Sequence, residues 1–285
     1  SLPLILYGVI VQQMDLPNPF TIQELFIAGI VPALLMIVLL TLYSIWTTRH
    51  DRLEATPFHR GVAWQSLKDM KWEAPLPIIV LGGIYSGFFA VSEAAAVTAF
   101  YVVIVEVFIH REVPVKQLPR VIREAMVMVG GILLILGVSL AFTNFLVDAE
   151  IPQALFEWIR TFIESKFTFL ILLNLILLAL GAILDIFSAL VIMIPLIVPL
   201  ALRFGVDPVH LGIIFLANMQ IGYFTPPIGM NLFIASYRFK KPITELYQAT
   251  IPFMLVLLVA LVLITYVPEL SLYFLDRTEM PVQSP

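Results

Sequence analysis

A short stretch at residues 222–233, GYFTPPIGMNLF, combines groups that could bind a cation. Pro226 and Pro227 carry no backbone N–H, and Gly229 can adopt conformations that other residues avoid. A helix entering this stretch therefore unwinds and leaves the main-chain carbonyls from Phe224 to Gly229 without helical partners. Hard cations favour oxygen ligands, and the ends of two half-helices add complementary dipoles. The stretch predicts a cation site built mostly from main-chain oxygens, with a simple packing kink as the alternative.

A second polar interruption, LDIFS, occurs at residues 184–188 inside another apolar run. An acidic residue within a membrane segment is costly enough to require a role. We expect the tip around Leu184, Asp185 and Ser188 to approach the Pro-Pro break, with Thr225 and Asn231 supplying further oxygens. Asp185 has two open roles, since it could ligate the cation or cap the N-terminus of the following half-helix.

The composition places both interruptions in a lipid bilayer. Hydrophobic residues make up 60% of the 285 residues and charged residues 13%, whereas an average soluble domain has about 25% charged residues. The mean hydropathy is +0.99. The net charge of -4 comes without a basic patch, so nucleic-acid binding is not indicated. The absence of cysteine excludes disulfides and sulfur ligands to metals within this sequence.

Segment lengths and loop charges predict an all-α polytopic membrane protein. Uninterrupted apolar runs of about 20 residues can cross the hydrocarbon layer. Two interrupted runs, 77–109 and 167–202, have arms of about 13 to 18 residues, which we interpret as too short to span and therefore as re-entrant hairpins. Basic residues cluster in the loops at 49–71, 111–123 and 238–241, so these are assigned to the cytoplasm. The first hairpin then opens inward and the second outward.

An internal similarity indicates how the chain is organised. Residues 21–43 resemble residues 243–266, with Glu24 aligned to Glu245 and Pro32 to Pro252. The loop charges orient the two copies in opposite directions, which is typical of inverted-repeat secondary transporters. Residues 1–8 would then correspond to residues 228–235. We therefore expect the second repeat plus the end of a first repeat, with the N-terminal half of the same subunit missing.

The expected organisation has four parts. They are 1–48, the end of the first repeat; 49–74, a cytoplasmic loop with an interfacial helix; 75–275, the second repeat; and 276–285, a tail. Within the second repeat we expect interrupted helices at 77–109, a span at 124–147, an interfacial helix at 151–165, a hairpin at 167–202, a broken helix at 209–236 and a last span at 245–268. Smaller expectations concern single residues. The first interruption lies at Ser92 and Glu93, with Glu93 capping a helix or, alternatively, touching substrate. Gly83 with Gly87, and Gly130 with Gly131, are expected at close-packing positions, and Asn174 and Asn218 are expected to hydrogen-bond between helices.

Several motifs together resemble one transporter family. They are GGIYSGFFAVSEAAAV (82–97), IPQAL (151–155), GAILDIFSALVIMIPLIVPLA (181–201), DPVHLGII (207–214) and IGYFTPPIGMNLFIAS (221–236). In this order and combination the chain resembles the large membrane subunit of tripartite ATP-independent periplasmic (TRAP) transporters. Ser92 stands where that family often has Thr, and the tip reads DIFSA where many members have Asp-Pro-Thr-Ala, so the substrate and the tip geometry stay open.

The resemblance implies a sodium-driven importer of organic acids in the bacterial inner membrane, working by an elevator-type or related alternating-access mechanism. Its expected partners are a small four-helix membrane subunit and a periplasmic substrate-binding protein. Na+ is the expected coupling ion, at the hairpin tip and the Pro226–Pro227 break. The predicted sodium-binding residues are Leu184, Asp185, Ser188, Phe224, Thr225, Gly229 and Met230. The predicted substrate-binding residues are Asn231, Ser1 and Asp185.

The alternatives to this interpretation are an intramembrane enzyme, a stand-alone symporter and a passive scaffold subunit. An intramembrane aspartyl protease needs two converging carboxylates, and besides Asp185 only Glu93 and Glu106 are candidates, neither in a paired motif. A stand-alone anion or dicarboxylate symporter of related fold would work without a binding protein. A passive scaffold subunit would show no ion dependence. Catalysis is not expected, and the choice between C4-dicarboxylates, sialic acid and other carboxylates is left open.

Overall fold

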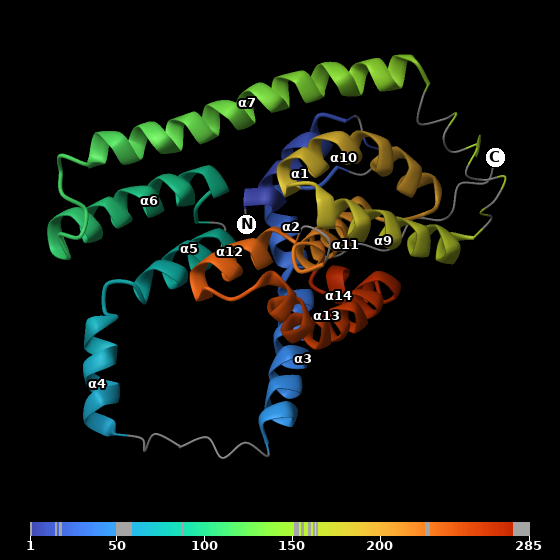
Figure 1. The fold of residues 1–285 in the computed structure, drawn as a ribbon. Helices are drawn as coiled ribbons and strands as arrows, with labels where there is room; N and C mark the ends of the chain where they lie inside the picture. The colour runs from blue at the N-terminus through green and yellow to red at the C-terminus, as the bar shows by residue number, and fades with distance from the viewer. Residues whose placement is uncertain are drawn as a thin grey trace. The chain divides into compact units, whose positions relative to one another are not determined.

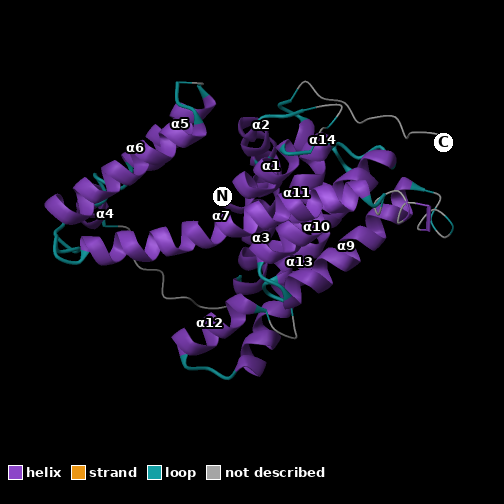
Figure 2. Cartoon of the chain, turned by 90° about the horizontal axis from the view of Figure 1, so that it is seen from above, coloured by secondary structure: helices purple, strands orange, loops and turns teal. Residues whose placement is uncertain are grey.

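The computed structural model describes residues 2–14, 16, 19–49, 59–86, 88–150, 154, 157–158, 161, 163, 165–225 and 229–275. Within these ranges all regular structure is helical, as Figure 2 shows. Five of the described helices are long and apolar enough to cross a membrane. The predicted all-α polytopic membrane class is therefore confirmed. The chain divides into two compact units, 1–48 with 133–285 and 49–132, each described here by itself.

The larger unit is built around one buried helix, α11 (Pro208–Gly222), which is apolar on nearly all sides. A helix without a polar face is stable only when other helices surround it. Helix α9 packs along α11, and α1, α2, α10 and α13 also contact it (Figure 1). The unit's helices are α1 (Leu2–Gln12), α2 (Ile22–Ala28), α3 (Ile30–Thr48), α9 (Lys166–Ile183), α10 (Ile186–Arg203), α11, α12 (Met230–Phe239), α13 (Ile243–Tyr266) and α14 (Glu269–Leu272). Helix α7 (Leu118–Asp148), which contains the expected span 124–147, has residues in both units.

The two similar segments form antiparallel neighbours. Helices α2 and α3 make one continuous span of 27 residues, since Gly29 between them keeps helical angles. Near the end of α3 the Tyr43 ring meets the Phe253 ring of α13 edge-on, with centroids 5.1 Å apart. Helix α14, which follows α13, packs against α2 and α3. The opposite orientation agrees with an inverted repeat, while the repeat itself stays a prediction.

Helices α9 and α10 form a hairpin whose open ends lie together. Lys166 Nζ, at the start of α9, donates to the Gly205 carbonyl just beyond α10, at 3.1 Å. The Phe169 and Phe204 rings stack with centroids 4.4 Å apart. The chain thus returns to the side from which it started, as expected. Each arm, however, has 18 residues and is long enough to cross a bilayer, so the prediction of arms too short to span is wrong.

The smaller unit contains α4 (Arg60–Asp69), α5 (Pro75–Tyr85), α6 (Val91–Val103), the π-helix η1 (Ile104–Ile109) and the first part of α7. Helices α5 and α6 pack together. The interruption expected at Ser92 and Glu93 lies earlier, between Tyr85 and Val91. Glu93 belongs to the first turn of α6, where its Oε2 accepts the Ala90 N–H at 3.0 Å and caps the helix. The capping role of Glu93 is confirmed and the position of the break is corrected.

The remaining expectations concern close-packed glycines and the segments 151–165 and 276–285. A Cβ added at Gly83 of α5 would clash with Phe89 Cδ2, so the expected close packing is found there, whereas Gly87 lies outside the described residues. A Cβ added at Gly130 or Gly131 of α7 would meet no described heavy atom within 4 Å, so close packing at these two glycines stays a prediction. The expected interfacial helix at 151–165 lies largely outside the described residues, as does the expected tail at 276–285.

Candidate cation and substrate site

The turn between α9 and α10 is closed by Asp185. Leu184 and Asp185 both have extended backbone angles, which end α9 and begin α10. Asp185 Oδ2 accepts the N–H groups of Phe187 and Ser188, each at 3.0 Å, and Ser188 Oγ donates to Asp185 Oδ1 at 2.5 Å. This is a side-chain N-cap, which satisfies donors that a helix start otherwise leaves open. Of the two roles open for Asp185, the structure shows the cap, and cation ligation stays a prediction.

The end of α11 tightens before the Pro-Pro sequence. Phe224 N–H donates to Ile221 O and Thr225 N–H donates to Gly222 O, both at 2.9 Å. Thr225 Oγ1 donates to Ile221 O at 3.0 Å, so this hydroxyl hydrogen is used within its own helix end. The lone pairs of the same oxygen can still act as acceptors. Helix α11 thus ends where the Pro-Pro motif predicts, although Pro226 and Pro227 lie outside the described residues.

Helix α12 restarts beyond the break at Gly229. Gly229 has φ +50°, and a Cβ there would lie 3.1 Å from Thr225 O and 3.3 Å from Tyr223 O. Two main-chain oxygens therefore gather beside a residue that has no side chain to block them. Tyr223 O also lacks its usual helical donor, since the residue four positions on is Pro227. Carbonyl oxygens are the ligands that hard cations favour, and the Na+ site itself stays a prediction.

The hairpin tip and the break are directly connected. The Ile186 N–H, at the start of α10, donates to the Tyr223 hydroxyl at 2.6 Å. Just before these residues α9 crosses α11 at Gly181 and Gly222, where a Cβ on Gly222 would lie 2.6 Å from Gly181 Cα and C. Only glycine allows the two backbones to approach this closely. The crossing places the Asp185 turn beside the end of α11, as the sequence predicts.

The predicted site residues fall into three groups. Leu184, Asp185 and Ser188 lie at the tip; Phe224, Thr225, Gly229, Met230 and Asn231 lie at the break and in the first turn of α12; Ser1 lies outside the described residues. Among the described residues, hydrogen bonds connect the tip to Tyr223 and not to Thr225 or Asn231. Sequence reasoning missed Tyr223, because a tyrosine at the end of an apolar run carries no signal for a partner 37 residues away.

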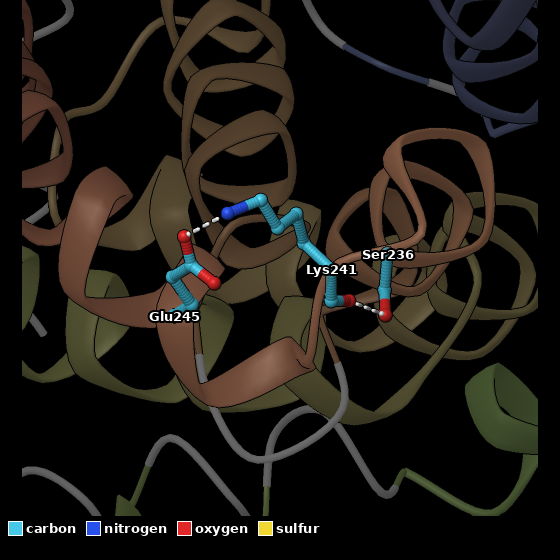
Figure 3. Close-up of polar contacts among 3 residues, drawn as sticks. All are labelled: Ser236, Lys241 and Glu245. Carbon is cyan, nitrogen blue, oxygen red and sulfur yellow. Dashed lines mark hydrogen bonds and ion pairs between the residues drawn. The ribbon is translucent and has the colours of Figure 1, made fainter.

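The connection between α12 and α13 fixes the direction of α12. Lys240 ends α12 with φ +52°, a left-handed conformation. Ser236 Oγ donates to Lys241 O at 2.6 Å, and Lys241 Nζ lies 2.7 Å from Glu245 Oε1, as Figure 3 shows. These contacts join the last turn of α12 to the first turn of α13. They orient α12, and with it Gly229 and Asn231 at its other end.

A polar cluster joins helices α9, α11 and α13. Asn218 Nδ2 of α11 donates to Asn174 Oδ1 of α9 at 2.6 Å, and Asn174 Nδ2 donates to Thr265 Oγ1 of α13 at 3.2 Å. Asn218 is fully buried. The expected interhelical role of both asparagines is confirmed. Such bonds hold membrane helices in a fixed register, since their polar groups find no other partner in lipid.

Comparison with known proteins gives a consistent assignment. The family described as "Tripartite ATP-independent periplasmic transporter, DctM component" matches residues 1–270. A C4-dicarboxylate TRAP transporter large permease protein, DctM, from Rhodobacter capsulatus is 36% identical over 283 residues, covering 95% of this chain and 64% of that protein. An isethionate TRAP transporter permease protein, DctMQ, from Oleidesulfovibrio alaskensis is 34% identical, covering 96% of this chain and 42% of that protein. A sialic acid TRAP transporter large permease protein, SiaM, from Vibrio cholerae is 30% identical, covering 95% and 62% respectively. The chain thus spans less than two thirds of the length of these relatives.

Proposed function

The chain belongs to the DctM-component family of tripartite ATP-independent periplasmic transporters, and from this membership we propose that it works in sodium-coupled import of an organic acid, as the large membrane subunit of such a transporter. The relatives are named for C4-dicarboxylates, isethionate and sialic acid, all of which are organic anions near neutral pH. Transport rather than catalysis is the proposed activity.

The proposed setting is a bacterial inner membrane with two partner proteins. The apolar helices make the chain a multi-pass membrane protein, and a periplasmic system needs the inner membrane for its permease. The partners are a small membrane subunit and a periplasmic substrate-binding protein. The relative named DctMQ is a single permease protein, so the small subunit can be separate or fused.

The observation that carries the proposal is the hydrogen bond from Ile186 N–H to the Tyr223 hydroxyl. It holds together two interrupted helices, and interrupted helices in lipid are stable only where their open main-chain groups line a cavity or find a ligand. The Tyr223 and Thr225 carbonyls lie beside Gly229 on one side, and we propose that oxygens of Leu184 and Ser188 supply the other side. We place Na+ between them.

The proposed sodium ion also explains how the site could accept a negatively charged organic acid. A bound cation offsets part of the charge that a carboxylate brings into a poorly solvated site. Because the cation orders the break first, the first turn of α12 with Asn231 takes its final position before the acid binds. Asn231, Asp185 and Ser1 are the residues proposed at the substrate, with Asp185 acting through its cap on α10.

Sodium-titrated uptake by the assembled transporter in proteoliposomes tests this proposal. Tyr223→Phe removes the acceptor of one main-chain hydrogen bond, worth about 0.5–1.5 kcal/mol, so the sodium concentration for half-maximal uptake should rise roughly two- to tenfold. Thr225→Val should act in the same direction. Tyr266→Phe is the matched control, because that hydroxyl also bonds to a main-chain group, donating to Phe167 O at 3.3 Å, but lies near the open end of the hairpin.

Three results would count against the proposal in different ways. Equal sodium dependence in the wild type, Tyr223→Phe and Thr225→Val would place the ion elsewhere. Uptake that needs no sodium at all would remove the coupling itself. Uptake that needs no binding protein would instead indicate a stand-alone symporter of the same fold.

A further inference from the structure

A cavity of about 200 Å³ lies in the smaller unit, where α5 begins and η1 follows α6. Helices α5 and α6 pack side by side (Figure 1). The walls come from residues 72–77, at the start of α5, and from residues 101–106, at the end of α6 and in η1. The candidate cation site uses none of these residues. A water molecule occupies roughly 30 Å³ in the liquid, so the cavity has room for a small organic molecule.

Two aromatic side chains form part of the cavity wall. Trp72 and Tyr101 both line it, and the Tyr101 hydroxyl donates to the Trp72 carbonyl at 2.6 Å, which holds the two residues together. Lys71 Nζ lies 5.4 Å from the centre of the Trp72 ring, within the distance of about 6 Å at which the face of a tryptophan attracts a cation. The Trp72 ring is thus accessible to an ammonium group.

Two carboxylates line the same cavity. Glu73 Oε1 lies 3.5 Å from His110 Nε2, and the Glu73 side chain is 48% exposed. Glu106 belongs to the π-helix η1, where the His110 N–H donates to Val105 O at 2.8 Å. Glu106 is only partly exposed, and its carboxylate makes no hydrogen bond or ion pair with any residue that the structure describes. A partly buried carboxylate without a counter-charge is costly, and short π-helices frequently occur at functional sites.

Aromatic faces beside carboxylates match an organic cation. We propose that the cavity binds a small primary ammonium compound, whose ammonium group lies between Glu73, Glu106 and the Trp72 ring. The three N–H groups of such an ion can donate to both carboxylates, and its apolar part lies against Leu76 and Val105, which also line the cavity. Among the described residues no group of three His, Asp or Glu side chains is placed to hold a metal ion. The ammonium group belongs either to a free amine or to the headgroup of phosphatidylethanolamine, which share this chemistry.

Fluorine NMR of the full-length subunit tests the proposal. The protein is labelled with 5-fluorotryptophan and placed in nanodiscs of phosphatidylglycerol, which carries no ammonium group, and the Trp72 signal is the one that Trp72→Phe removes. Titration with n-butylammonium chloride should shift this signal to saturation and leave the signals of Trp46, Trp64 and Trp158 in place. n-Butanol and butyrate are the matched probes, since they have a similar apolar part with no charge or a negative charge. Neither should shift the Trp72 signal.

Variants assign the binding to the carboxylate and the ring. Glu106→Gln should weaken n-butylammonium binding about fivefold, the equivalent of roughly 1 kcal/mol. Glu112→Gln is the matched control, because it removes the same charge six residues later, from a side chain that does not line the cavity. Tyr101→Leu should also weaken binding, whereas Tyr101→Phe keeps the ring and should retain it. Lys71→Gln removes a neighbouring positive charge and should tighten binding.

Three outcomes would overturn the proposal. They are a Trp72 signal that n-butylammonium leaves in place, a Trp72 signal that n-butanol shifts equally, and an affinity that Glu106→Gln does not change. The comparison of the three probes needs no substitution, so it holds even if a variant fails to fold. Nanodiscs of phosphatidylethanolamine then identify the source of the ammonium group. If the lipid headgroup binds, they shift the Trp72 signal without added amine and weaken n-butylammonium binding; if a free amine binds, they do neither.

Discussion

Gly222→Ala should separate the two helices that hold the candidate site. The added Cβ would lie 2.6 Å from Gly181 Cα and C and 3.1 Å from Ala182 N, all of them backbone atoms that cannot rotate away. Carbon atoms pack comfortably at about 3.5–4.0 Å. The backbones of α9 and α11 must therefore move apart by roughly 1 Å at their crossing. The shift acts directly on the Asp185 turn, which follows Gly181 by four residues.

The stability lost in Gly222→Ala has two parts. Overpacking in a close contact costs about 1–3 kcal/mol. The displacement also lengthens the bond from Ile186 N–H to the Tyr223 hydroxyl, and a buried donor left without its acceptor costs about 1–3 kcal/mol. Together these reduce the free energy of unfolding by roughly 2–6 kcal/mol. Thermal unfolding of the purified protein, followed by tryptophan fluorescence, should show a midpoint lower by several degrees, at about 2–4 °C per kcal/mol.

A control and a double substitution make the result interpretable. Gly82→Ala in α5 adds the same atom where no heavy atom of the structure lies within 4 Å, so it should leave the midpoint unchanged or raise it slightly through helix propensity. Tyr223→Phe combined with Gly222→Ala should destabilise less than the sum of the two, because both act on one hydrogen bond. Equal midpoints for Gly222→Ala and Gly82→Ala would refute the close crossing.

Substitutions at three other places test the cap on α10, the contact between Asn218 and Asn174, and the left-handed residue Lys240. Asp185→Asn keeps an oxygen acceptor for the α10 cap and should change stability little, whereas Asp185→Ala should lower the free energy of unfolding by about 1 kcal/mol; equal losses in thermal unfolding would contradict the cap. Asn218→Leu removes the shorter of the two hydrogen bonds that Asn174 Oδ1 accepts, the other coming from Thr265 Oγ1 at 3.4 Å. It should cost about 0.5–1.5 kcal/mol, part of which Asn174→Leu in the same chain should restore; full additivity would argue against their contact. Lys240→Gly should raise the unfolding midpoint slightly, because Lys240 has φ +52°, and the roughly 1–2 kcal/mol that this left-handed conformation costs a residue other than glycine exceeds the about 0.4–1 kcal/mol lost through the more flexible unfolded chain. Lys241→Gly should lower the midpoint by removing the ion pair to Glu245 and adding flexibility; a drop in both would show that the Lys240 side chain contributes contacts.

Much of the architecture follows from local sequence signals. Pro226, Pro227 and Gly229 mark the end of α11 because proline and glycine act on the backbone within a few residues. Asp185 marks the hairpin turn for a similar reason, since its cap bonds to the residues two and three positions after it. The antiparallel arrangement of α3 and α13 follows from loop charges, which reflect membrane orientation and do not depend on packing.

The parts that sequence reasoning missed depend on distant contacts. Glycine in an apolar helix does not reveal whether another helix crosses there, so close packing was assigned to Gly130 and Gly131 and not to Gly181 and Gly222. The Tyr223 hydroxyl was overlooked because its donor belongs to another helix. The break near Glu93 was placed too late because a capping carboxylate lies inside the helix it caps, three residues after its donor.

The tip of the hairpin also has a consequence for biogenesis. Asp185 satisfies the N–H groups of Phe187 and Ser188 with atoms made within three residues, so this part of the turn is complete as soon as α10 forms. The Ile186 N–H has its acceptor only after the ribosome has added Tyr223, 37 residues later. A newly inserted hairpin therefore keeps one polar group unmatched in a poorly solvated region until α11 docks, at a cost that favours rapid docking. Substitutions at Tyr223 should for this reason reduce the amount of protein that matures in the cell, before any effect on transport is measured.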